Sequence, residues 1–166
     1  DVTNYKSSGF DVLRAVKNNT NELTTILNNI TSKGCHTVLF TGSVFEQNEG
    51  IGSMPLRAFS PYGLSKGLTS DIFKIYCERY GVKLGKFVIP NPFGPFEEPR
   101  FTSFLARSWL NGEVPKVNSP LYVRDNIHIR PLAKAYRTFA EDLFQENYSY
   151  KKLNLSGYVE SQGSFT

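Results

Sequence analysis

Short apolar segments separated by one helix-length spacer constrain the fold of this chain most strongly. Residues 37–40 read Thr-Val-Leu-Phe, and residues 82–89 hold a second apolar segment. Between them, Pro61 opens a stretch whose apolar residues recur at helical spacing to about Tyr80. Continuous apolar strands that alternate with helices are typical of parallel β-α-β units, whose sheets are buried on both faces. We therefore predict an α/β fold built on a doubly wound, parallel sheet.

The segments on either side of this unit predict further elements. Apolar spacing predicts one long helix over residues 10–30, although the asparagines in its middle are poor helix formers. After the second strand, the run Pro-Asn-Pro-Phe-Gly-Pro at residues 90–95 predicts a turn. The remaining predicted elements are a helix at 100–111, a strand at 121–123 leading into 124–128, a helix from Pro131, and a short strand at 152–155.

Composition narrows the class of partner. The 166 residues suit a single domain with a real core, and the net charge is +4 without any run of five to eight Lys or Arg. We therefore expect no nucleic-acid partner, and a mildly positive cleft for an anionic small molecule. Two cysteines are too few for a disulfide framework, and no apolar run approaches 18 residues. We expect a soluble, reduced, cytoplasmic protein with no membrane partner.

The motif Ser-Pro-Tyr-Gly-Leu-Ser-Lys at residues 60–66 is the first candidate for chemistry. Tyr62 and Lys66 are four residues apart, which puts them on the same face of a helix. A free tyrosine has a pKa near 10, and an adjacent ammonium favours its phenolate, so such a pair can move a proton. The same spacing also occurs by chance in many helices, and the neighbouring residues decide between the two readings.

The ends of the two predicted strands supply those neighbours. Thr41 and Ser43 follow the first strand, and Asn91 follows the second. In open α/β sheets, ligands bind at the carboxyl edge of the strands. These hydroxyl and amide groups are therefore expected beside Tyr62 and Lys66 in one cleft.

Four segments together resemble the extended short-chain dehydrogenase/reductase family, the NAD-dependent sugar epimerases and dehydratases. They are Val-Leu-Phe-Thr-Gly-Ser-Val-Phe at 38–45, Tyr-Gly-Leu-Ser-Lys at 62–66, Asn-Pro-Phe-Gly-Pro at 91–95 and Arg-Asp-Asn-Ile-His at 124–128. Their order and separations are similar to the family's along nearly the whole chain. The resemblance implies an incomplete Rossmann-like domain, residues 1–95, carrying part of a small substrate-binding region, residues 96–166.

The resemblance also implies roles for the catalytic residues. Tyr62 would be the general acid/base as hydride moves to or from nicotinamide, and Lys66 would hold the nicotinamide ribose and favour the phenolate. Thr41 would hydrogen-bond the substrate oxygen, with Ser43 as the alternative on the substrate side. Thr41 could instead be a plain hydroxyl at a strand end.

The binding residues follow from the same resemblance. Ile89 and Pro90 match a segment that touches the cofactor, and Asn91 matches a substrate contact. Arg124 matches an arginine that pairs with the phosphates of a sugar nucleotide, as a guanidinium fork suits. Asn18, or its neighbour Asn19, matches a helix asparagine near the cofactor. In the alternative readings, Arg124 is a surface ion-pair partner and Asn91 braces a turn.

The departures from the family pattern leave the function open. No Gly-x-Gly-x-x-Gly motif or spaced variant occurs, so the chain is expected to lack the N-terminal dinucleotide fingerprint, and also the C-terminal end. One hypothesis is an NAD- or NADP-dependent enzyme acting on a nucleotide sugar, with the missing part supplied elsewhere. A second is a split-gene remnant that folds and dimerises but binds the dinucleotide weakly. A third is a binding module without chemistry. The resemblance implies a homodimer formed through the two long helices.

Overall fold

The computed structural model describes residues 10–50, 52–145 and 147–166. Contacts divide the chain into two compact units. Unit 1 comprises residues up to 88 together with 138–154, and unit 2 comprises 89–137 together with 155–166. The division expected from the family resemblance was different in kind: residues 1–95 for the cofactor and residues 96–166 for the substrate. That division stays a prediction.

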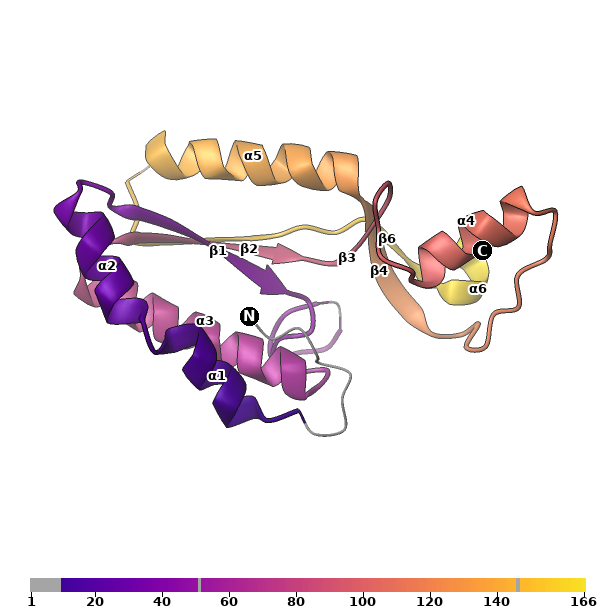
Figure 1. The fold of residues 1–166 in the computed structure, drawn as a ribbon, viewed down its shortest axis with the longest axis horizontal. Helices are drawn as coiled ribbons and strands as arrows, with labels where there is room; N and C mark the ends of the chain where they lie inside the picture. The colour runs from indigo at the N-terminus through magenta and orange to yellow at the C-terminus, as the bar shows by residue number, and fades with distance from the viewer. Residues whose placement is uncertain (1–9, 51, 146) are drawn as a thin grey trace. The chain divides into compact units, whose positions relative to one another are not determined.

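Unit 1 is built on a three-stranded sheet with the order β1-β2-β5. Strand β2 runs parallel to β5, with Leu84 opposite Tyr150 and Val88 opposite Asn154. Figure 1 shows β1 and β2 pointing in the same direction. The predicted α/β class with a parallel sheet is thereby confirmed. The elements are α1 (Val12–Thr20), α2 (Leu23–Ser32), β1 (Thr37–Ser43), α3 (Pro61–Arg79), β2 (Lys83–Ile89), the C-terminal part of α5 (Ile129–Gln145) and β5 (Tyr150–Asn154).

Helices cover both faces of this sheet. Helices α1, α2 and α3 lie on one face, and the part of α5 that belongs to unit 1 lies on the other (Figure 1). On the α5 side, the rings of Phe87 and Phe139 are 5.6 Å apart, and Gly85 leaves room for Leu143. On the other side, the core consists of buried apolar residues from α2, β1, α3 and the start of β2: Leu23, Leu27, Phe40, Cys77, Val82 and Leu84. This two-sided burial is why the strands read as continuous apolar runs.

The prediction of one long helix over residues 10–30 is wrong, because the structure has two helices there. Helix α1 ends at Thr20 and α2 begins at Leu23. The Thr20 hydroxyl donates to the Val16 carbonyl at 2.8 Å, and the break follows a stretch rich in asparagine. Side chains that bond to the local backbone compete with the helix and favour its ends.

Unit 2 has its own sheet with the order β3-β4-β6. Strand β3 is parallel to β4, and β4 is antiparallel to β6. Its elements are β3 (Asn91–Phe93), α4 (Phe101–Leu110), β4 (Val123–His128), the N-terminal part of α5, β6 (Tyr158–Ser161) and α6 (Gln162–Phe165).

Two features of unit 2 differ from the sequence-based expectation. Residues 91–93 form β3 rather than a turn, and Pro92 is tolerated because β3 is at the edge of its sheet. The C-terminal residues, for which no element was predicted, form β6 and α6. They are ordered by long-range contacts, since the Phe93 ring lies 5.5 Å from that of Phe165. Across the described ranges, no helix is both long and apolar enough to cross a membrane.

Candidate active site

The start of α3 places Tyr62 and Lys66 at the site. Ser60 caps the helix, with its hydroxyl accepting from the Gly63 amide at 3.2 Å, and Pro61 occupies the first turn. Tyr62 therefore sits in the first turn, and Lys66 follows one turn later on the same face. Both side chains are half-buried. The predicted pairing on one helix face is present in the structure.

A cavity of about 210 Å³ lies against this face of α3. It is lined by residues of α1, β1 and α3: Asn19, Phe40, Tyr62, Ser65, Lys66, Thr69 and Phe73. Asn19 is half-buried at the cavity, whereas Asn18 is exposed. Of the two adjacent asparagines, the geometry therefore favours Asn19 for any ligand of this cavity.

Lys66 connects the helix to the end of β1. Its Nζ donates to the Thr41 carbonyl at 2.9 Å and lies 4.8 Å from the centre of the Phe40 ring. Burial lowers the pKa of Lys66, the charge of Glu46 opposes this, and the charge of Lys86 adds to the lowering. A lysine with a lowered pKa at a cavity is a feature of functional sites.

The loop at residues 44–60, between β1 and α3, packs tightly on the start of α3. A Cβ at Gly63 would lie 1.9 Å from the Phe45 carbonyl oxygen, and one at Gly67 would lie 2.1 Å from Gln47 Oε1. The Phe45 ring stacks on that of Phe59 at 5.1 Å. Glycines one helical turn apart thus let the loop approach the helix backbone, and this spacing is visible in the sequence.

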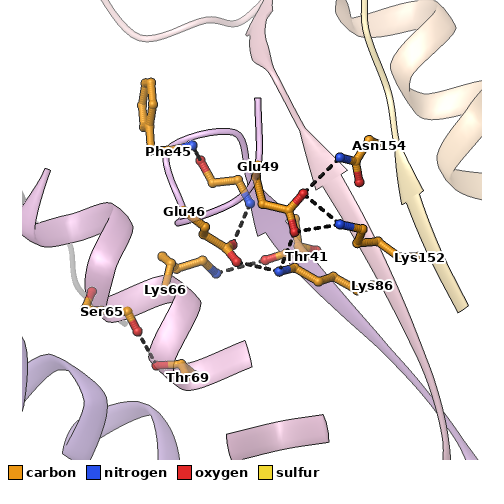
Figure 2. A network of polar contacts seen from close by, with 11 residues as sticks. Thr41, Phe45, Glu46, Glu49, Ser65, Lys66, Thr69, Lys86, Lys152 and Asn154 are labelled. Carbon is orange, nitrogen blue, oxygen red and sulfur yellow. Dashed lines mark hydrogen bonds and ion pairs between the residues drawn. The ribbon is translucent and has the colours of Figure 1, made fainter. Parts of the chain in front are cut away.

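A buried network of charges ties the same loop to the sheet (Figure 2). Lys86 of β2 holds Glu46 Oε2 at 2.7 Å and Glu49 Oε1 at 3.0 Å. From β5, Lys152 Nζ lies 3.1 Å from Glu49 Oε2, and Asn154 Nδ2 donates to the same oxygen at 2.9 Å. Glu46, Glu49 and Lys86 are each less than a tenth exposed.

Mutual pairing favours the charged forms of Lys86 and Glu49. Burial alone would lower the pKa of Lys86, but its hydrogen bonds and attraction to Glu46 and Glu49 raise it overall. Burial alone would raise the pKa of Glu49, but Lys86, Lys152 and Asn154 lower it overall. Sequence reasoning missed this network. The available signal was a lysine inside an apolar strand, since buried lysines are almost always paired.

Ser43 supports the loop. Its hydroxyl accepts from the Phe45 amide at 3.3 Å, and its own amide donates to Glu46 Oε1 at 2.7 Å. Ser43 therefore orders the turn that follows β1.

Four predicted site residues belong to unit 2, or to the link that leads into it. Ile89 ends β2, buried Pro90 follows, and Asn91 begins β3. Asn91 Nδ2 donates to the Asp125 carbonyl at 3.0 Å. Arg124 lies on β4, with its guanidinium carbon 5.1 Å from the centre of the Tyr122 ring. In unit 2, Asn91 and Arg124 are thus brought onto neighbouring strands.

Comparison with known proteins decides the family. The sequence profile of the NAD dependent epimerase/dehydratase family matches residues 3–154. The chain belongs to that family. A search of curated protein sequences gave no match.

Solved structures of nucleotide-sugar enzymes share the fold. A UDP-N-acetylglucosamine 4-epimerase from Methanobrevibacter ruminantium M1 has a TM-score of 0.74 at 23% identity over 99% of this chain and 55% of its own. A dTDP-glucose 4,6-dehydratase from Bacillus anthracis, solved with NAD, has a TM-score of 0.70 at 19% identity over 95% of this chain and 52% of its own. A UDP-glucose 4-epimerase from Thermotoga maritima has a TM-score of 0.67 at 21% identity over 91% of this chain and 52% of its own. This chain spans about half the length of each.

Within the described residues, no group of three or more His, Cys, Asp or Glu side chains is arranged to hold a metal ion. The polar groups at the cavity are a phenol, an ammonium, two hydroxyls and an amide. Such a set can transfer protons and hydrogen-bond a ribose or a sugar.

Proposed function

We propose that this chain carries the acid/base centre of an NAD- or NADP-dependent epimerase/dehydratase-type oxidoreductase that acts on a nucleotide sugar. The observation that carries the proposal is that Tyr62 and Lys66 line one cavity at the start of α3, in a member of this family. Its structural neighbours include UDP-sugar and dTDP-sugar enzymes, which supports the substrate class.

In this proposal Tyr62 exchanges a proton with a hydroxyl of the sugar. The phenolate removes the proton of the sugar hydroxyl as the carbon that bears this hydroxyl loses a hydride. In the reverse step the phenol returns the proton. The nicotinamide cofactor, when bound, supplies the hydride acceptor. The Lys66 ammonium favours the phenolate, and in our proposal the Thr41 hydroxyl hydrogen-bonds the substrate oxygen.

The residues present fit one end of the cofactor. Lys66 and Asn19 supply donors at a cavity beside Tyr62, as a nicotinamide ribose requires. In our proposal Ile89 and Pro90 contact the nicotinamide. The 166 residues contain no glycine-rich turn of the type that binds a pyrophosphate at a helix N-terminus. The chain therefore provides the catalytic end of a dinucleotide site.

Unit 2 supplies the substrate contacts in this proposal. The Nε atom of Arg124 is buried and has no hydrogen-bond partner among the described residues. A buried donor of this kind costs free energy unless a ligand satisfies it. A diphosphate suits the planar guanidinium, and in our proposal Asn91, on the neighbouring strand, contacts a sugar hydroxyl.

The test is turnover of nucleotide sugars. The chain is incubated with NAD or NADP and a panel of UDP- and dTDP-hexoses, and the products are identified by chromatography and mass spectrometry. Tyr62→Phe is expected to lower kcat by about 100-fold or more, since general acid/base catalysis contributes that much. The matched control is Tyr80→Phe, which removes a hydroxyl at the other end of α3. A Tyr62→Phe variant that keeps most of the activity contradicts the proposal.

A second candidate is a family member that folds but binds the dinucleotide weakly. Among the described residues, β1 has a hydrogen-bonded neighbour on one side only, and the sequence carries no glycine-rich turn. A wild-type chain that converts none of the panel supports this candidate. Homodimer formation through the long helices stays a prediction, and sedimentation tests it.

A further inference from the structure

A row of charged side chains extends from the cavity that Lys66 lines to strand β5. From the cavity toward β5 the side chains alternate in sign: Lys66, Glu46, Lys86, Glu49 and Lys152. Figure 2 shows the side chains of Lys66 and Lys86 both extending toward the Glu46 carboxylate. Glu46 is therefore the negative group between two lysines that come from different elements.

Glu46 is held in place more firmly than an ordinary loop residue. Its Oε1 accepts from the Ser43 amide at 2.7 Å, and its Oε2 pairs with Lys86 Nζ at 2.7 Å. Gly42 leaves the space these groups need, because a Cβ there would lie 2.8 Å from Lys86 Cε and 3.1 Å from Glu46 Oε1. The carboxylate is thus fixed above the end of β1, next to Thr41.

The Lys66 ammonium is also anchored to β1. It donates to the Thr41 carbonyl, two residues before the Ser43 amide that holds Glu46. Both groups are therefore anchored to the backbone of β1, at positions two residues apart. The negative charge of Glu46 acts on the half-buried ammonium of Lys66 and favours its charged form.

We propose that Glu46, held by Ser43 and Lys86, is a positioning residue that stabilises the charged form of Lys66 at the Tyr62 cavity. The purpose of that charge rests on the proposed function, because the ammonium is what favours the Tyr62 phenolate. The charge itself is a property of the folded chain. It can be measured without cofactor or sugar.

The groups that face Lys66 determine whether each substitution raises or lowers its pKa. Its own helix contributes Tyr62, β1 contributes the Thr41 carbonyl and the Phe40 ring, and α1 contributes only the neutral Asn19. Charges reach it from Glu46 in the loop and from Lys86 on β2. Burial has the largest effect on the pKa of Lys66 and lowers it, Glu46 raises it, and Lys86 has a smaller lowering effect.

The experiment is a pH titration of Lys66 in the purified chain. Lysine labelled with carbon-13 at Cε is followed by nuclear magnetic resonance, and a Lys66→Arg variant assigns the signal. Glu46→Gln is expected to lower the midpoint by about one pH unit or more, as loss of a close opposite charge does. A Glu46→Asp variant keeps the negative charge, and its midpoint is expected to stay close to that of the wild type. Loosening of the loop would instead move the midpoint up, toward that of a free lysine.

Glu49→Gln is the matched control. It makes the same carboxylate-to-amide change in the same network and also removes a partner of Lys86, but Glu49 lies on the far side of Lys86 from Lys66. We expect it to leave the Lys66 midpoint close to the wild-type value. A shift as large as that of Glu46→Gln would show that the effect is not specific to Glu46 and would overturn the proposal.

A double variant covers the case in which Glu46→Gln does not fold. Glu46→Gln with Lys86→Met removes both members of the buried pair, so neither is left without the other, and Glu49 keeps Lys152 and Asn154 as partners. Because Glu46 affects Lys66 more than Lys86 does, the midpoint is expected to fall here too, by less than in the single variant. A folded Glu46 variant whose midpoint equals or exceeds that of the wild type overturns the proposal. A lowered midpoint in a chain without turnover supports this proposal while counting against the proposed function.

Discussion

Gly63 shows how one missing side chain lets the loop at residues 44–60 reach the catalytic helix. A Cβ at this position would lie 1.9 Å from the Phe45 carbonyl oxygen and 2.6 Å from its carbonyl carbon. Backbone atoms cannot move aside as a side chain can. The loop and the first turn of α3, which carries Tyr62, are therefore held together by a glycine.

We expect Gly63→Ala to destabilise the chain by about 1–3 kcal/mol, the usual cost of overpacking, even though alanine is the better helix former. Urea unfolding measures the change. Gly67→Ala is the graded control, because its Cβ meets only the movable end of the Gln47 side chain, and we expect a smaller loss. A Gly63→Ala variant as stable as the wild type would show that the loop does not pack on α3 in this way.

At the scale of elements, Glu49 joins the loop to two strands. It bonds to Lys86 of β2 and to Lys152 and Asn154 of β5. Breaking a buried pair by removing one partner costs roughly 3–5 kcal/mol. The loop is thus an integral part of the sheet's carboxyl edge rather than a surface connection.

The lowered pKa of Glu49 predicts how stability depends on acid. Its pKa lies below the ordinary 4.5 in the folded chain, so its stabilisation is complete above that value. The stabilisation is lost as pH falls through the folded pKa. Unfolding free energies measured from neutral pH downward should therefore fall less steeply for Glu49→Gln than for the wild type. Glu78→Gln, at an exposed position of α3, should follow the wild-type curve. Identical acid slopes for the wild type and Glu49→Gln would contradict the assignment.

At the scale of the whole molecule, the sequence lacks the main anion site of a dinucleotide fold. Without a glycine-rich turn ahead of a helix, no backbone amides are provided for the pyrophosphate. The chain spans about half of each similar solved structure. The chain does contain the region around Tyr62 and Lys66.

We therefore predict weak NAD binding by this chain. Calorimetric titration should show no saturation in the micromolar range, and whatever binding occurs at high concentration should weaken further in Lys66→Met. Lys74→Met, on the same helix but directed at the Tyr150 ring, should leave it unchanged. Affinity in the micromolar range or tighter would contradict the prediction.

Sequence alone determined the fold class and the local placement of Tyr62 and Lys66. Apolar runs and helical spacing report which faces are buried, so β1, α3 and β2 were predictable to within a few residues. The spacing of Tyr62 and Lys66 is a property of one helix and needs no tertiary information. Four short motifs in a fixed order sufficed to indicate the family.

Tertiary structure decided what depends on residues far apart in the chain. Strand β3 and the C-terminal β6 each pair with β4, although the sequence of β3 by itself favours a turn. The choice of Asn19 over Asn18 depends on how α1 lies against α3. Glu49 meets Lys152 across 103 positions, a partnership that no local pattern encodes. Tyr62 and Lys66 were therefore readable from the sequence, whereas the charges that surround Lys66 emerge only when the loop, β2 and β5 converge.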